Sequence, residues 1–184
     1  MNSINIKNKN SLNIVIIGFM GTGKTTVSDY LENITGKEKI DSDSYIVEKS
    51  GMKISDIFEK YGEDYFRNME TEAISEISSK SSIIISCGGG VPMRDENVKL
   101  LKENGAVILL TASPSVILER VKDSDSRPIL NNNMNEAFIK NLMDKREKKY
   151  SSVSDITIDT DNKSIEEICD EIIHKVSDFK FKNK

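Results

Sequence analysis

Histidine and cysteine are scarce in this sequence of 184 residues, and their scarcity argues against several kinds of active site. With one histidine, His174, neither a histidine-based metal site nor a Ser-His-Asp triad is expected. It falls outside the apolar stripe of a predicted C-terminal helix, which indicates a surface position. Cys87 and Cys169 are too few for a disulfide framework and lack the spacing of metal ligands. Any general base is therefore expected to be a carboxylate.

Long apolar runs and an excess of basic charge are also missing. No stretch approaches the roughly 20 apolar residues that cross a bilayer, and the polar residues 1–11 lack the apolar segment of a secretory signal. The formal net charge is -4, with basic residues spread among acidic ones, which argues against a nucleic-acid partner. Hydrophobic residues make up 37% of the chain, enough for one domain with one core. We expect a cytoplasmic monomer without a membrane partner.

Strand and helix patterns alternate along the chain. Short apolar runs predict strands at residues 12–17, 37–41, 81–86, 105–110 and 155–160. Apolar residues at helical spacing predict helices at residues 23–34, 42–50, 54–62, 63–79, 96–104, 114–122, 136–150 and 164–176. This alternation is typical of an α/β fold in which helices cover both faces of a mostly parallel sheet of about five strands. Ligands of such sheets bind at the carboxyl ends of the strands.

A glycine-rich loop follows the first predicted strand. Residues 18–25, GFMGTGKT, match the pattern G-x-x-x-x-G-K-[ST] between a strand and a helix, the context that makes this phosphate-binding motif credible. Backbone N–H groups of such a loop surround an anion, and the N-terminus of the helix adds partial positive charge. Lys24 should reach the β- and γ-phosphates, and the Thr25 hydroxyl should bind Mg²⁺. A glycine turn that happens to precede a helix is the alternative.

The expected nucleotide is ATP, since no NKxD stretch for reading guanine follows a later strand. The residues expected to bind it are Gly21, Thr22, Gly23, Lys24, Thr25 and Thr26.

Two carboxylates follow the second predicted strand. Asp41 and Asp43 are two residues apart, and on extended backbone this spacing points both side chains to the same side. One could serve the Mg²⁺ shell while the other accepts a hydrogen bond or a proton from a substrate hydroxyl. An acidic turn or a helix N-cap explains the pair equally well. The spacing alone leaves both interpretations open.

Arg67 lies on a helix that is otherwise apolar on its inner side, with Glu70 one turn later. A fixed guanidinium is suited to a substrate carboxylate, although a surface salt bridge has the same spacing. Three glycines, Gly88 to Gly90, then follow a buried strand. They indicate a close approach to the main chain, with a plain mobile loop as the alternative.

Two more arginines lie in the second half of the chain. Arg127 precedes a proline in the polar stretch SDSRPIL, where a lid arginine could reach the transferred phosphoryl group and help to exclude water. Arg146 lies on a heavily charged helix, and the charge pattern alone favours a solvated surface position.

Taken in order, the motifs GFMGTGKT, DSD, FRNME, CGGG, SRPIL and REKKY resemble those of the shikimate kinases, from about Ile14 to about Val176. The resemblance implies a P-loop, nucleoside-monophosphate-kinase-like α/β fold with a lid. It also implies transfer of the γ-phosphoryl group of MgATP to the 3-hydroxyl of shikimate, in the chorismate and aromatic amino-acid pathway. The sequence departs from the family in REKKY, which lacks the Pro-Leu that often precedes the tyrosine.

The resemblance also implies roles for single residues. Lys24 and Thr25 bind the phosphates and Mg²⁺, and Asp41 supports the metal through water. Asp43 holds shikimate hydroxyls and is the candidate base. Arg67 and Arg146 bind the carboxylate with help from the backbone of Gly88, Gly89 and Gly90. Arg127 is the lid arginine, and Arg120 lies against adenine. The expected domain is 12–176, with a lid at about 123–134 and polar tails at 1–11 and 177–184.

Two other functions remain open at this point. A related small-molecule kinase, such as a gluconate kinase, would use the same phosphate loop without the FRNME, GGG and RPIL set. A non-catalytic ATP sensor should have lost Lys24, Asp43 or Arg127, and all three are present.

Overall fold

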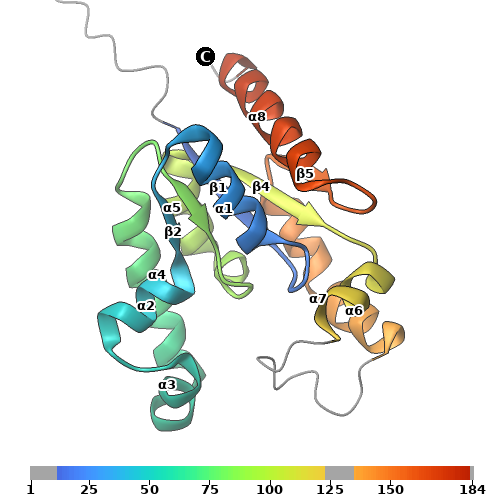
Figure 1. Ribbon diagram of the computed structural model, residues 1–184. Helices are drawn as coiled ribbons and strands as arrows, with labels where there is room; N and C mark the ends of the chain where they lie inside the picture. The colour runs from blue at the N-terminus through green and yellow to red at the C-terminus, as the bar shows by residue number, and fades with distance from the viewer. Residues whose placement is uncertain (1–11, 123–134, 183–184) are drawn as a thin grey trace, which may run out of the picture.

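The computed structural model describes residues 12–122 and 135–182, which form a five-stranded parallel sheet with helices on both faces (Figure 1). The strand order is β2-β3-β1-β4-β5, and all four neighbouring pairs are parallel. The strands are β1 (Asn13–Gly18), β2 (Lys39–Asp41), β3 (Ile84–Ser86), β4 (Gly105–Thr111) and β5 (Ile156–Asp159). The parallel sheet predicted from the alternation of strands and helices is thus confirmed.

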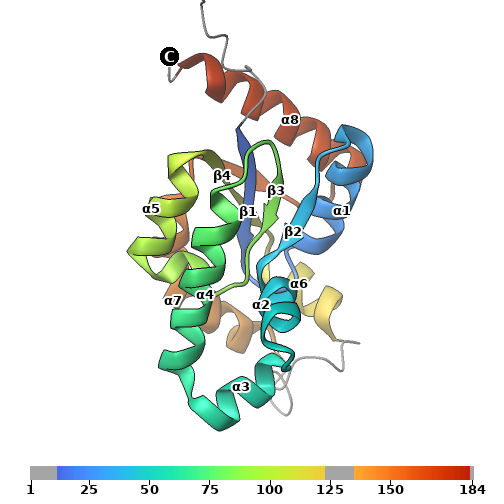
Figure 2. The same ribbon diagram turned by 90° about the vertical axis from the view of Figure 1, so that its left-hand side faces the viewer.

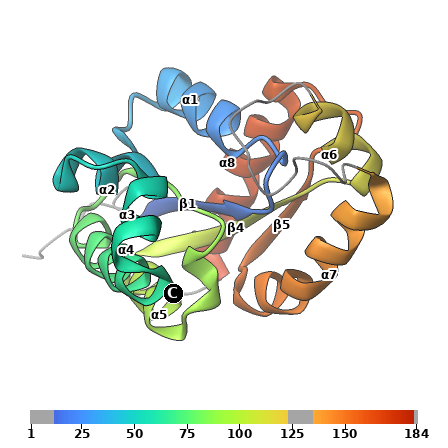
Figure 3. The ribbon, with the colours of Figure 1, turned by 90° about the horizontal axis from the view of Figure 1, so that it is seen from below.

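The helices form two layers around this sheet. One face is covered by α1 (Lys24–Thr35) and α8 (Ile165–Lys182), and the other by α4 (Glu63–Ser78), α5 (Asp95–Glu103) and α7 (Glu136–Val153) (Figure 3). Near the carboxyl ends of the strands lie α2 (Ser42–Ser50), α3 (Ile54–Tyr61), the short 3-10 helix η1 (Val91–Met93) and α6 (Pro114–Val121). Figure 2 shows α2 and α3 at this end of the sheet.

The central strand β1 contributes to two hydrophobic cores. Ile14 and Ile16 pack with α1 and α8, whereas Val15 and Ile17 pack with the helices of the opposite face. All residues of β1 are buried because a central parallel strand is covered on both sides. Successive side chains of a strand point to opposite faces, so burial on both faces needs an unbroken apolar run rather than an alternating one.

The sheet brings three sequence motifs to one edge. Strands β1, β2 and β3 are neighbours, and they lead into the glycine-rich loop, Asp41 and Gly88–Gly90 respectively. Because parallel strands place their carboxyl ends at the same edge, these motifs meet although they are far apart in the chain.

The last helix is longer than its sequence pattern suggests. The first part of the expected polar tail 177–184 is helical, because α8 continues to Lys182. Phe179 packs against the core formed with α1, which accounts for the added length. The expected tail 1–11 and the lid at 123–134 lie outside the described residues. Among the residues that the structure does describe, no helix has both the length and the apolarity to cross a membrane.

Candidate active site

The glycine-rich loop joins β1 to the N-terminus of α1. Gly21 and Gly23 have φ values of 79° and 90°, a region that side-chain-bearing residues rarely adopt. The Lys24 Nζ donates hydrogen bonds to the carbonyl oxygens of Gly18 at 2.9 Å and Phe19 at 3.1 Å. The loop therefore combines left-handed glycines, a helix N-terminus and an ammonium group, which together suit a polyphosphate.

A cavity of about 490 Å³ opens beside this loop. Its wall contains all six predicted nucleotide-binding residues of the loop. Arg120, near the end of α6, also lines it and donates to the side chain and carbonyl of Thr160, at 3.0 and 3.1 Å. The structure thus brings Arg120 to the predicted nucleotide site.

The sequence analysis missed part of this wall, namely Thr160, Lys163, Ile165 and Ile168. The signal that could have found them is their place between the end of β5 and the first turn of α8, at the edge where the other loops meet.

The carboxylate of Asp41 is held by three hydrogen bonds. Its Oδ1 accepts from the backbone N–H groups of Asp43 at 3.1 Å and Ser44 at 3.0 Å, and its Oδ2 accepts from the Ser86 hydroxyl at 2.9 Å. Asp41 is therefore the N-cap of α2, which was the alternative to a role in binding Mg²⁺ or substrate. The capping role and a role at the site are compatible, because capping fixes a carboxylate at the carboxyl end of β2.

Asp43 lies in the first turn of α2, so the extended backbone assumed for both aspartates is wrong at this residue. Its carboxyl group faces the main chain of Gly88. Burial raises the pKa of Asp43, the nearby Asp41 raises it further, and Lys24 and Arg67 partly oppose the shift. The group is therefore more basic than an ordinary aspartate, as a general base requires.

Each of the three consecutive glycines faces one predicted site residue. A Cβ on Gly88 would lie 2.3 Å from Oδ1 of Asp43, and a Cβ on Gly90 would lie 1.9 Å from Nη1 of Arg67. A Cβ on Gly89 would lie 3.2 Å from Nη1 of Arg146. The close approach that the sequence indicated thus includes side chains of this protein.

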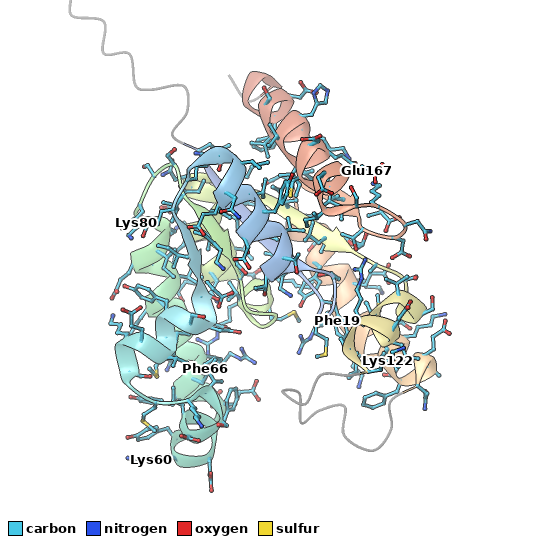
Figure 4. All side chains as sticks on the ribbon, in the orientation of Figure 1. Phe19, Lys60, Phe66, Lys80, Lys122 and Glu167 are labelled. Carbon is cyan, nitrogen blue, oxygen red and sulfur yellow. The ribbon has the colours of Figure 1, made fainter. Side chains whose placement is uncertain are left out.

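Arg67 rests on a buried carboxylate. Its Nη1 lies 3.1 Å from Oε1 of Glu70, whose side chain is only 1% exposed, so the predicted pair is not a surface salt bridge. The guanidinium carbon lies 5.3 Å from the ring centre of Phe66, which Figure 4 labels on α4. Burial raises the pKa of Glu70, and Arg67 lowers it in part. The arginine is therefore fixed by both charge and packing.

Arg146 reaches the same loop from α7. Its Nη1 lies 3.4 Å from the carbonyl oxygen of Gly89, so the surface position favoured by the charge pattern is wrong. One turn later, the hydroxyl of the buried Tyr150 donates to the same oxygen at 2.7 Å. Lys149 of the same helix forms an ion pair with Asp95 of α5. Sequence reasoning did not single out Tyr150.

Arg127 and the rest of the predicted lid, residues 123–134, lie outside the described residues. Every other predicted site residue lies at the carboxyl edge of the sheet, in two adjoining groups. One is the phosphate loop with Arg120, and the other is the glycine loop with Asp41, Asp43, Arg67 and Arg146.

Comparison with known proteins identifies the family of this chain. A family model described as shikimate kinase matches residues 20–177. The chain belongs to the shikimate kinase family. Members of this family are ATP-dependent phosphotransferases that act on an alcohol group, and the expected P-loop, nucleoside-monophosphate-kinase-like fold is confirmed.

Similar proteins carry the same description. A shikimate kinase of Thermodesulfovibrio yellowstonii is 45% identical over 161 residues, which cover 88% of this chain and 92% of that protein. The structure of an Acinetobacter baumannii shikimate kinase in complex with shikimate has a TM-score of 0.84 and 32% identity, and the match covers 92% of this chain and 95% of that one. A gluconokinase structure from Sinorhizobium meliloti, at 17% identity and a TM-score of 0.63, shares the fold alone.

The distances around the glycine loop predict that alanine at Gly90 and alanine at Gly89 lower the free energy of unfolding by different amounts. Gly90 has right-handed helical φ and ψ, so Gly90→Ala strains no backbone but pushes the Arg67 guanidinium off Glu70. Leaving that buried carboxylate without its cation should lower the free energy of unfolding by roughly 2 to 4 kcal/mol at neutral pH. Gly89→Ala, the matched control, should cost less than about 1 kcal/mol. Urea unfolding measures both values, and equal losses would contradict the account.

Proposed function

We propose that this protein transfers the γ-phosphoryl group of MgATP to the 3-hydroxyl of shikimate, giving shikimate 3-phosphate and ADP. The observation that supports this most is the set of charged groups around the glycine loop. Two guanidinium groups and one basic carboxylate face a few residues of bare main chain, beside a loop built for phosphates. A small acid that carries hydroxyl groups matches this pattern of charges.

In this proposal the nucleotide lies in the cavity beside the phosphate loop. Lys24 and the backbone of Gly21 to Thr26 bind its phosphates, while Arg120 lies against the base. The Thr25 hydroxyl and the carboxylate of Asp41 are hard oxygen donors of the type that Mg²⁺ prefers, with Asp41 acting through water. No group of three or more His, Cys, Asp or Glu side chains suited to a metal occurs in the described part of the chain. A site with two oxygen donors, from Thr25 and Asp41, suits Mg²⁺, which is commonly held by one or two protein groups together with phosphates.

Mg²⁺ would supply neutralisation of the charge on the β- and γ-phosphates. Side chains of the protein supply further positive charge and the base. Lys24 places positive charge at the transferred phosphoryl group, and the resemblance to the family implies that Arg127, outside the described residues, supplies a second cation. Asp43 accepts the hydrogen bond of the attacking hydroxyl and takes its proton. Its burial makes the carboxylate a stronger base, which suits this step.

Arg67 and Arg146 bind the substrate carboxylate, with the backbone of Gly88 to Gly90 between them. A ligand without that carboxylate would lose the hydrogen bonds and the charge pairing that these two guanidinium groups offer, so the pair selects for an acid. Arg67 is positioned before any substrate arrives, since it is already fixed by Glu70. We further propose that the enzyme acts in the cytoplasm as a monomer on these two small molecules.

A coupled assay of ADP release tests this function directly. Purified protein with MgATP should release ADP in proportion to added shikimate, and background release without shikimate should be negligible. Gluconate serves as the control substrate because it is a hydroxy acid without the ring. Stoichiometric ADP release with gluconate and none with shikimate would replace this proposal with a gluconokinase activity.

The raised pKa of Asp43 predicts that its ionised carboxylate lowers the free energy of unfolding. Its proposed role as the base predicts that the same carboxylate is needed for activity. A carboxyl group with a raised pKa in the folded state is harder to ionise there. The free energy of unfolding therefore falls as the pH rises above the ordinary pKa of the group. Asp43→Asn should therefore raise the melting temperature at pH 7 while it lowers kcat by roughly 10²- to 10⁴-fold. Thermal unfolding and steady-state rates measure the two effects.

Asp41→Ala is the matched control, since it removes an N-cap and should lower the free energy of unfolding by about 0.5 to 2 kcal/mol. If Asp43→Asn lowers the melting temperature in the same way, Asp43 is a structural residue and its place in the mechanism is wrong.

A further inference from the structure

Tyr150 is a buried polar side chain that the proposed mechanism does not use. It lies in the core between α7 and the sheet, with 4% of its surface exposed, and its hydroxyl donates to the carbonyl oxygen of Gly89 at 2.7 Å. Burial raises the pKa of Tyr150, so its hydroxyl keeps its proton and acts as a donor at neutral pH.

The two glycines beside Gly89 are anchored elsewhere. The Gly88 N–H donates to the Ser42 hydroxyl at 2.8 Å, and the carbonyl oxygens of Gly88 and Gly90 accept from the backbone of η1 at 3.1 and 2.9 Å. Gly89 itself is held through its carbonyl oxygen, by Tyr150 at 2.7 Å and by Arg146 at the longer distance of 3.4 Å. The middle of the loop therefore depends on α7, and chiefly on the tyrosine.

Fixing the Gly89 carbonyl also fixes the direction of the Gly90 N–H. The two groups belong to one planar peptide unit, and the described chain has no cis peptide bond, so they point in opposite directions. The N–H of Gly90 thus points away from Tyr150, and no described residue accepts a hydrogen bond from it. A buried or half-buried N–H without a partner is suited to a ligand acceptor.

The helix that carries Tyr150 is itself held in place. Lys149 pairs with Asp95 at the start of α5, and Val153 packs in the same core as Tyr150. Arg146 lies on the same helix one turn before the tyrosine. The position of α7 therefore sets both the Arg146 guanidinium and the orientation of the Gly89–Gly90 peptide.

We propose that Tyr150 is a positioning residue for the substrate carboxylate. Its hydroxyl fixes the Gly89–Gly90 peptide, and with it the middle of the backbone loop that Arg67 and Arg146 approach. The inference rests on the proposed function, because it names the residue that aligns the acid-binding part of that site. It does not require Tyr150 to touch the substrate.

Tyr150→Phe removes the hydroxyl and keeps the ring. It should raise the KM for shikimate about tenfold and change the KM for ATP by less than about twofold, because only the carboxylate contacts are misaligned. Tyr45→Phe is the matched control, since the Tyr45 hydroxyl also donates a hydrogen bond, to the Glu76 carboxylate at 2.6 Å, on an exposed part of α2 and α4. This control should leave both constants within about twofold of those of the unchanged protein.

A double-mutant cycle with Arg146→Lys separates positioning from general loss of structure. If Tyr150 acts by aligning the groups around Gly89, its effect on the shikimate KM should shrink several-fold once Arg146 has been replaced. Equal increases in the two KM values after Tyr150→Phe, or an unchanged KM for shikimate, would overturn the inference.

Amide hydrogen exchange gives a readout that does not depend on activity. In protein without substrates, Tyr150→Phe should speed exchange of the Val91 amide, which donates to Gly88, by about tenfold, while the amides of β1 stay protected. Unchanged exchange at Val91 would contradict a holding role for the hydroxyl. If the unchanged protein releases no ADP with shikimate, the proposed function fails, and the exchange result still decides whether Tyr150 holds the loop.

Discussion

The site depends on the absence of side chains over three residues of main chain. Gly88, Gly89 and Gly90 let charged groups from three helices approach one stretch of backbone, namely Asp43 of α2, Arg67 of α4 and Arg146 of α7. At 1.9 to 2.3 Å from the nearest charged atom, a Cβ on Gly90 or Gly88 would collide. The parallel sheet then sets this backbone beside the phosphate loop, because β3 and β1 are neighbours.

The electrostatics of the site are largely arranged before a ligand binds. Arg67 lies on the buried Glu70, and Asp41 is oriented by two backbone amides and a serine hydroxyl. Such preorganised charges need little rearrangement as phosphoryl transfer proceeds. They also have an energetic cost, since burial raises the pKa of both Asp43 and Glu70. Functional sites commonly keep such unfavourable groups because stability above a threshold is sufficient.

The fold and the phosphate loop could be predicted from the sequence because their signals are local. Strands and helices follow from periodicity, and the phosphate loop follows from GFMGTGKT. Asp41 and Asp43 lie at the carboxyl end of β2, as their place in the sequence indicated, but the helix start at Ser42 was not used to orient them. Arg146 was misread from charge pattern alone and corrected by resemblance, since contact with Gly89 depends on how α7 crosses the sheet. Tyr150 gave no local signal, because its role arises from tertiary contacts alone. Thr160 could have been found only from its place after the last strand.

The central claim is that Arg67, Arg146 and Asp43 contact one substrate molecule because all three lie against the backbone of Gly88 to Gly90. The most direct measurement is a crystal structure of this protein with shikimate and ADP. The account predicts the carboxylate within about 3 Å of both Arg67 and Arg146, and a ring hydroxyl within about 3 Å of Asp43. A shikimate molecule whose carboxylate binds neither arginine, or whose hydroxyl groups lie away from Asp43, would contradict the account.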